Sequence, residues 1–198
     1  MGRSNRIQEP NLTYNLGSQC INRDPRMAPE KFKEGFIEVL RKAKEKYEFE
    51  LISYCIMDNH IHLIIHTVEG GAPISRIMQY IKSRFARWYN KMMNRIGPFW
   101  NERYWDTIVQ HAKDAVNYLL WLLWYLGFNP VRAGKCANPR TYKYSSINAY
   151  LEENAHKEVA ITQHEYFLKL GATFKERVKK FLVYEELYRK RHCIFEWV

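Results

Sequence analysis

The segment ELISYCIMDNHIHLIIHT, residues 50–67, constrains the fold of this chain more than any other. Residues 50–57 and 61–67 are mainly apolar, with β-branched side chains in both runs, and the short polar hinge Asp58-Asn59 separates them. Two such runs joined by turn-forming residues predict an antiparallel hairpin. At least part of the core must therefore be an antiparallel sheet.

A helix is predicted on each side of this hairpin. Before it, Pro29 opens a segment whose apolar residues recur at helical spacing, and proline is favoured in the first turn of a helix. After it, Gly70-Gly71 interrupts the chain ahead of a long amphipathic helix over about residues 74–95. Each helix has one apolar face that must be covered, and the sheet can cover both.

The remaining elements complete the order. Residues 11–20 have weak strand character, and another short strand is expected near residues 104–110. A third helix is expected from about residue 112 until Pro130, because proline ends or kinks a helix. The first six elements of this β-α-β-β-α-β-α order are the ferredoxin-like split unit, an α+β fold with an antiparallel sheet and helices on one face.

Composition limits the classes of partner. The 198 residues, 46% of them hydrophobic, suffice for one packed domain and an extension. The 31 Lys and Arg against 21 Asp and Glu give a net charge of +10, which favours a polyanion, nucleic acid first. No apolar run is long enough to span a bilayer and the four cysteines include no CxxC pair, so we expect no membrane partner and a reducing, intracellular location.

Three regions are expected along the chain. Residues 1–11 form a polar leader, residues 12–135 hold the predicted sheet and its helices, and residues 136–198 form an extension. The extension begins with the Tyr-rich connection RTYKYSSINAY and continues as a basic, mainly helical tail.

Two histidines stand one residue apart just past the hinge. Side chains alternate along a strand, so His60 and His62 point to the same side of the sheet. Two neutral imidazoles held in this way can bind one divalent ion. They can equally be a surface pair or hydrogen-bonded sheet residues, and His66, which continues the alternation, slightly favours this second interpretation.

A metal ion would need a further ligand, and the third helix offers one. Tyr125 and Asn129 are four residues apart, so they lie on one face of that helix. The amide oxygen of Asn129 can bind Mg²⁺ or Mn²⁺, and the hydroxyl of Tyr125 can attack phosphorus. Periodicity alone favours a simpler interpretation, in which Tyr118 and Tyr125 belong to a core stripe and the asparagine ends the helix before Pro130.

Four motifs in one order resemble a known family. MDNHIHLIIH is similar to the His-hydrophobic-His motif of HUH single-strand endonucleases, and most of all to that of the Y1 transposases of the IS200-like superfamily. GPFWNERY resembles the Gly-x-hydrophobic-aromatic block of that family, YLGFNPVRAG its Tyr-x-x-x-Asn-Pro-Val-Arg-Ala-Gly block, and YKYSSINAY its aromatic-Ser-Ser-x-x-x-Tyr segment. The last two are more typical of its REP-associated tyrosine transposases. The resemblance covers about residues 12–150 and implies that residues 12–135 are the catalytic domain.

Two positions depart from the family pattern. Asp58 stands where the family usually has proline, which changes the hinge but removes no expected ligand. Asn15 occupies the place of a histidine that is common in the first strand.

The resemblance implies a metal-dependent transposase and endonuclease that nicks and rejoins single-stranded DNA. It makes His60, His62 and Asn129 the metal ligands, with Mg²⁺ or Mn²⁺ as the cofactor, and Tyr125 the nucleophile of a 5′-phosphotyrosine intermediate. A divalent ion polarises the scissile phosphate and stabilises charge in the transition state. A phenol is a weak nucleophile until it is positioned and partly deprotonated beside such charge.

Basic side chains are expected to bind the DNA. Between residues 76 and 95 the long helix carries six basic residues and no acid, which suits phosphate groups, although a solvated helix flank is the alternative. Trp100 and Tyr104 can stack on unpaired bases or simply be buried. The predicted DNA-binding residues are Arg76, Lys82, Arg84, Arg87, Lys91, Arg95, Arg103 and Arg132.

The expected partner is single-stranded or hairpin DNA. The resemblance places the protein in the bacterial cytoplasm at the nucleoid, acting as a monomer or a homodimer. The main alternative is a catalytically silent protein on the same fold that only binds DNA hairpins. A replication-initiator nickase is a third hypothesis, which the NPVRAG block disfavours.

Overall fold

The predicted hairpin lies at the heart of the sheet. In the computed structural model, which describes residues 8–153, 155 and 158–193, β2 and β3 pair antiparallel from Phe49↔Thr67 to Ile56↔Ile61. β1 pairs with the other edge of β3 and β4 with β1, so the strand order is β2-β3-β1-β4. The strands are β1 (Thr13–Gln19), β2 (Phe49–Ile56), β3 (His60–Thr67) and β4 (Trp105–Ile108).

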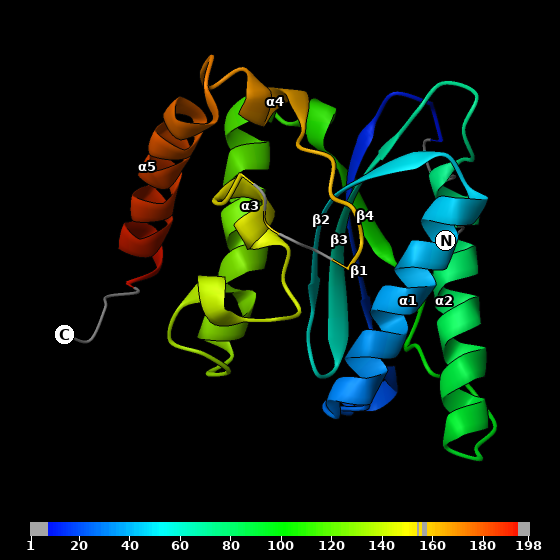
Figure 1. The fold of residues 1–198 in the computed structure, drawn as a ribbon. Helices are drawn as coiled ribbons and strands as arrows, with labels where there is room; N and C mark the ends of the chain where they lie inside the picture. The colour runs from blue at the N-terminus through cyan, green and yellow to red at the C-terminus, as the bar shows by residue number, and fades with distance from the viewer. Residues whose placement is uncertain (1–7, 154, 156–157, 194–198) are drawn as a thin grey trace.

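The helices lie in two layers, one on each side of this sheet (Figure 1). They are α1 (Glu30–Lys46), α2 (Ile74–Met92), α3 (Ala115–Arg132), the short α4 (Glu165–Leu168) and α5 (Phe174–His192). The predicted element order, the α+β class and the helical C-terminal extension are therefore confirmed.

Alternation along β3 builds a different layer on each face. Ile61, Leu63 and Ile65 join the apolar core beneath α1 and α2, as the split unit requires. The seventh element does not share that face. Helix α3 covers the opposite side, because its apolar residues pack with Ile52 of β2 and Ile64 of β3, which point that way (Figure 1).

Proline does not end α3 where it was expected to. Pro130 lies inside the helix, which continues to Arg132. The helix then closes with Gly134 at φ +65°, a hydrogen bond from Gly134 N to Val131 O at 2.9 Å and one from Lys135 N to Pro130 O at 2.8 Å. This pair of bonds around a left-handed glycine is the Schellman motif, which satisfies the last carbonyl groups of a helix. Proline is tolerated here because only one helical bond is lost, near the end.

The Tyr-rich connection runs along the free edge of β2. Tyr54 N donates to Ser146 Oγ at 2.8 Å, and Ser146 N donates to the Tyr54 carbonyl at 3.0 Å. The hydroxyl groups of Tyr142 and Tyr150 donate to the carbonyls of Ile56 and Ile52. The edge is thereby covered, which removes a site for unwanted strand pairing. The domain division at residue 135 stays a prediction.

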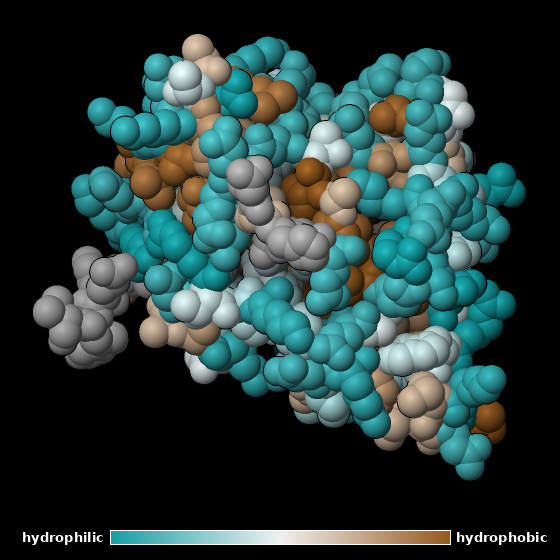
Figure 2. All heavy atoms as spheres, in the orientation of Figure 1, coloured by the Kyte–Doolittle hydropathy of each residue, from teal (hydrophilic) through white to brown (hydrophobic). Residues whose placement is uncertain are grey.

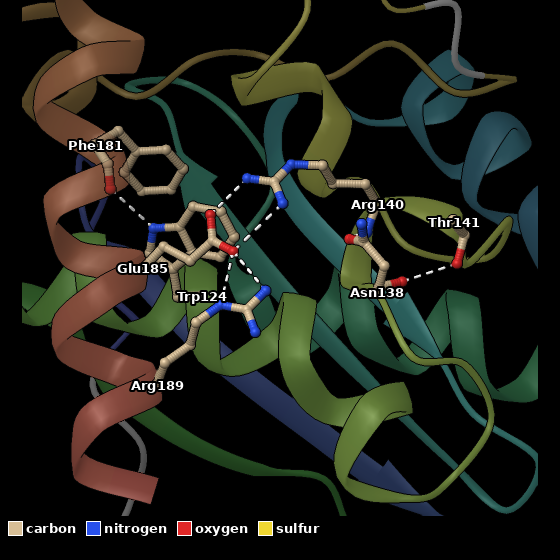
Figure 3. A network of polar contacts seen from close by, with 7 residues as sticks. All are labelled: Trp124, Asn138, Arg140, Thr141, Phe181, Glu185 and Arg189. Carbon is tan, nitrogen blue, oxygen red and sulfur yellow. Dashed lines mark hydrogen bonds and ion pairs between the residues drawn. The ribbon is translucent and has the colours of Figure 1, made fainter. Parts of the chain in front are cut away.

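Helix α5 packs on the outer side of α3 through stacked aromatic rings and a buried ion-pair network (Figure 3). The carboxylate of Glu185 accepts hydrogen bonds from Arg140 and Arg189, and Trp124 Nε1 donates to the Phe181 carbonyl at 3.0 Å. An arginine on each side satisfies the buried carboxylate, so the pairing fixes the position of α5. The extension thus packs against the outer side of α3 and stabilises the position of that helix.

The visible surface of this orientation is mainly hydrophilic, and hydrophobic atoms show in separate patches, the larger ones at the upper left and near the middle of the face (Figure 2). In the part of the chain that the structure describes, no helix combines the length and apolarity that crossing a membrane requires.

Candidate active site

The predicted site residues of β3 and α3 meet at one end of the sheet. His60 Nε2 lies 3.3 Å from Asn129 Oδ1. The rings of His60 and His62 are 4.9 Å apart between centroids, and those of His62 and Tyr125 are 5.5 Å apart, both edge to face. Residues 63 to 69 positions apart in the sequence thus form one cluster, because α3 crosses the face of β3 that carries the histidines.

The hinge fixes the orientation of His60. Asn59 Nδ2 donates to the Arg23 carbonyl at 3.0 Å, which turns Asn59 Oδ1 toward His60 Nδ1 at 2.6 Å. The Asn59 oxygen can only accept, so Nδ1 of His60 carries the proton and Nε2 presents its lone pair to Asn129. Neighbouring backbone bonds hold the hinge, since Cys20 N donates to the Asn59 carbonyl.

Both imidazoles are held in the neutral form. Burial lowers the pKa of His62 to about 3, and the neighbouring His60 lowers it further. Burial also lowers the pKa of His60, against opposing contributions from Asn129 and Asp58. A neutral imidazole has one nitrogen free to donate its lone pair, which is the state that binds a metal.

These groups suit a divalent ion. In the amide orientation of the structure, Asn129 Oδ1 and His60 Nε2 are two acceptors facing each other, and His62 Nδ1 is buried with no hydrogen-bond partner among the described residues. A cation between His60 Nε2 and Asn129 Oδ1 would satisfy both acceptors, and His62 Nδ1 is a further buried nitrogen that no described group satisfies. Among the described residues no group of three or more His, Cys, Asp or Glu side chains could hold a metal, so an ion at this place would depend on the Asn129 amide as its third ligand.

The structure separates the two candidate tyrosines. Tyr125 lies beside His62, and the guanidinium carbon of Arg132 lies 6.0 Å from the centre of the Tyr125 ring. The hydroxyl of Tyr118 instead lies 3.2 Å from Thr107 Oγ1 of β4. Helical spacing could not distinguish these tyrosines, but their neighbours do.

Sequence reasoning missed Trp105, which forms one wall of the cluster. Its ring lies 5.6 Å from that of His62, and the side chain is 44% exposed. It lies flat over Gly17 of β1, where a Cβ atom would come within 2.1 Å of the indole. The glycine in TYNLGSQ was a signal for this close approach, but its partner strand lies 88 residues further on.

Trp100 and Tyr104 prove to be buried core residues, 8% and 7% exposed, so they offer no stacking surface. Asn15, at the place of the family histidine, is also buried and donates to Thr107 Oγ1 at 3.3 Å. Of the aromatic residues in this region, Trp105 is the one exposed beside the histidines.

The predicted DNA-binding residues divide into four places. Arg76, Lys82 and Arg103 line a cleft of about 890 Å³ between α2 and residues 98–104. A smaller groove between α1 and α2, of about 430 Å³, contains three others: Arg84, Arg87 and Lys91. Arg95 donates to Asn90 Oδ1 at 3.1 Å beyond the end of α2. Arg132 alone lies beside the histidine cluster, because α2 covers the other face of the sheet.

Fold and cluster together define a class of protein: a ferredoxin-like sheet that presents a neutral histidine pair to a helix carrying tyrosine and asparagine. The chain belongs to the family described as "Transposase IS200 like", whose model matches residues 9–118. The match includes both histidines and ends before Tyr125 and Asn129.

Individual relatives agree with this assignment. A protein of Haemophilus influenzae named as a REP-associated tyrosine transposase is 26% identical over 132 residues, which cover 62% of this chain and 73% of the relative. A solved REP-associated tyrosine transposase bound to a REP hairpin has a TM-score of 0.60 at 18% identity, covering 82% of this chain and 93% of its own. That likeness shows the shared fold. The resemblance to IS200-like and REP-associated transposases is thereby confirmed.

Proposed function

We propose that this chain nicks and rejoins single-stranded DNA through a covalent 5′-phosphotyrosine intermediate on Tyr125. One observation carries the proposal: Tyr125 meets the histidine pair and Asn129 at one end of the sheet, where the buried His62 Nδ1 has no hydrogen-bond partner among the described residues. A purely structural cluster would be expected to satisfy its buried polar atoms.

His60, His62 and Asn129 would hold the divalent cofactor, Mg²⁺ or Mn²⁺. When bound, such an ion polarises the phosphate and stabilises the charge that develops on its oxygens. The protein keeps both imidazoles neutral by burial, so the site needs no deprotonation before it takes up a cation.

The bond changes balance without a further reactant. The phenol oxygen of Tyr125 attacks the scissile phosphorus, the P–O3′ bond breaks, and the departing strand gains the proton that the phenol loses. Attack by a 3′-hydroxyl on the phosphotyrosine reverses these changes and joins the strands. Arg132, whose guanidinium lies over the Tyr125 ring, is suited to pair with the phosphate.

The substrate in this proposal is a DNA hairpin with a single-stranded flank. The solved neighbour is bound to a REP hairpin, and this chain has basic residues on α2 and at Arg103 for phosphate groups. The exposed Trp105 ring is placed to stack on an unpaired base beside the scissile phosphate. A monomer or a homodimer acting at the bacterial nucleoid completes the proposal.

A covalent-adduct assay tests it. Labelled hairpin DNA with single-stranded flanks is incubated with the protein and Mn²⁺ or Mg²⁺ and resolved on a denaturing gel. We expect an adduct with the wild type that is absent from Tyr125→Phe, because only the nucleophilic oxygen is removed.

Tyr118→Phe is the matched control, since this tyrosine occupies the same helix but contacts Thr107. It should form the adduct at close to the wild-type rate. Tight hairpin binding with no adduct on any flank would instead establish a DNA-binding protein without chemistry.

A further inference from the structure

Asp58, the residue that replaces the family proline, connects three parts of the molecule. Its Oδ1 lies 2.8 Å from Lys33 Nζ of α1, and its Oδ2 lies 2.5 Å from Lys135 Nζ just after α3. Its backbone carbonyl accepts a hydrogen bond from Met27 N at 2.8 Å. Both carboxylate oxygens of Asp58 are therefore engaged, one by each lysine.

Lys33 anchors this carboxylate to α1. The Lys33 side chain is only 5% exposed, and its ammonium also donates to the Ala28 carbonyl at 2.8 Å. A lysine so deeply buried needs its ion pair, so this half of the contact belongs to the stability of the fold.

Lys135 joins the same carboxylate to the end of α3. The Schellman motif fixes its backbone, since Lys135 N bonds to Pro130 O and Gly134 N to Val131 O. The preceding turn contains Asn129, whose carbonyl accepts from Ala133 N at 3.1 Å. The Lys135 side chain is 45% exposed, so the fold does not need it to fill space.

The Asp58-Asn59 hinge and the last turn of α3 need an attractive contact of this kind between them. His60 Nε2 lies 3.3 Å from Asn129 Oδ1, which is long for a hydrogen bond, so this contact alone holds the two sides weakly. Asp58 lies two residues before His60, and Lys135 lies six residues after Asn129. Their ion pair is an attraction that holds the two sides of the cluster together before any cation or DNA arrives.

We propose that Asp58 and Lys135 are positioning residues, which set the placement of Asn129 and Tyr125 relative to the histidine pair. This inference rests on the proposed nicking activity. It gives a physical reason for an aspartate at the hinge, because its carboxylate pairs with Lys135.

The test has three measurements. The first is the single-turnover rate of adduct formation at saturating hairpin DNA with Mn²⁺, and the second is the affinity for the hairpin. The third is amide hydrogen exchange of residues 131–135 in the DNA-free protein. We expect Lys135→Met to slow the adduct by roughly 3- to 30-fold, since misplacing a reacting group by ~1 Å costs up to about 100-fold. Exchange at the end of α3 should quicken, and Lys135→Arg should restore both values.

Lys143→Met is the matched control. Lys143 pairs with Glu34 of α1 at 2.8 Å and is 53% exposed, so its removal deletes a comparable ion pair that does not involve the hinge. It should match the wild type in rate and in exchange at residues 131–135. Equal slowing by Lys143→Met would overturn the proposal, as would wild-type rate and exchange in Lys135→Met.

Asp58→Asn separates positioning from direct DNA binding. If Lys135 only contacted phosphate, freeing it from Asp58 would tighten hairpin binding and leave the saturated rate unchanged, which would overturn the inference. A positioning role predicts a slower rate in Asp58→Asn as well, in protein whose folding is verified by its melting curve. If the wild type forms no adduct, the proposed function is refuted. If amide exchange at residues 131–135 is then also unchanged in Lys135→Met, the structural role of the Asp58–Lys135 ion pair is refuted as well.

Discussion

The face of β3 that points toward α3 carries histidines at both ends. The histidine nitrogen atoms found at the two ends differ in whether they have hydrogen-bond partners. At the far end, His164 Nδ1 accepts from Tyr166 N at 3.1 Å, and its Nε2 lies 3.0 Å from Thr13 Oγ1. The same hydroxyl lies 2.9 Å from His66 Nδ1, and Gln110 Nε2 donates to it at 3.2 Å. Every nitrogen of His164 is matched.

At the near end the matching of nitrogen atoms is incomplete. His62 Nδ1 has no partner within the described ranges, and His60 Nε2 faces the acceptor oxygen of Asn129. An unsatisfied buried polar atom costs about 1–3 kcal/mol, so it is retained where something outside the chain satisfies it. The histidine contacts at the two ends thus differ in role. The contact of His164 at the far end stabilises the fold, and the cluster of His60 and His62 at the near end is available to a ligand.

The largest expected effect comes from replacing His62, at the near end, or His164, at the far end, with leucine in separate variants. His62→Leu should reduce adduct formation by roughly 10²–10³-fold or more, the range seen when a group that stabilises transition-state charge is removed. Its free energy of unfolding in urea should stay the same or rise, because a buried polar atom without a partner is replaced by an apolar side chain.

His164→Leu should show the reverse. It leaves Tyr166 N without its acceptor and removes one of the three contacts of Thr13 Oγ1, so the free energy of unfolding should fall by about 1–3 kcal/mol while the adduct rate changes little. A large stability loss in His62→Leu, or normal adduct formation by it, would break the comparison.

A smaller effect on the free energy of unfolding is expected from a change of pH. Burial, reinforced by the neighbouring His66, lowers the pKa of His164 to about 4, with a further small decrease from Lys169 and an opposing effect of Glu165. The unfolded chain binds this proton at about pH 6.5, so the stabilising contribution is complete above that pH and is lost as the pH falls toward 4. By pH 5 the loss is about 2 kcal/mol.

Urea unfolding at pH 7.5 and pH 5.0 measures this contribution as the difference between the wild type and His164→Leu. The other titrating groups, including the near-end histidines, are common to both proteins and cancel. Identical pH dependence in the two proteins would show that His164 is not held neutral by the fold.

The comparison also shows how far sequence alone could reach. Alternation in HIHLIIH predicted that the histidines share one side, and the short Asp58-Asn59 hinge predicted the hairpin that the structure confirms. These are local properties, encoded by neighbouring residues.

What the sequence did not reveal depends on contacts between distant segments. The partners of Asp58 lie 25 residues before and 77 residues after it, and the matching of His164 with Thr13 spans 151 residues. The side of the sheet that α3 covers is likewise set by tertiary packing, so no local pattern distinguishes a matched histidine from an unmatched one.

The smallest expected effect concerns two glycines that each lie against a tryptophan, Gly17 in β1 and Gly35 in α1. An added Cβ would come within 2.1 Å of Trp105 at Gly17 and within 2.1 Å of Trp88 at Gly35. Trp105 is exposed and can swing into solvent, so Gly17→Ala should change stability by less than about 0.5 kcal/mol. It should weaken binding of single-stranded flanks several-fold, because stacking contributes about 1–3 kcal/mol per base.

Gly35→Ala is the matched control for stability, in α1. Trp88 packs against Phe32 and Phe85, so it cannot leave freely, and we expect a loss of about 1–3 kcal/mol from overpacking, partly offset by the better helix propensity of alanine. Fluorescence anisotropy with a labelled single strand, with Trp105→Ala as the reference, decides the matter: if Gly17→Ala binds like the wild type while Trp105→Ala does not, the glycine is not what holds the indole over the sheet.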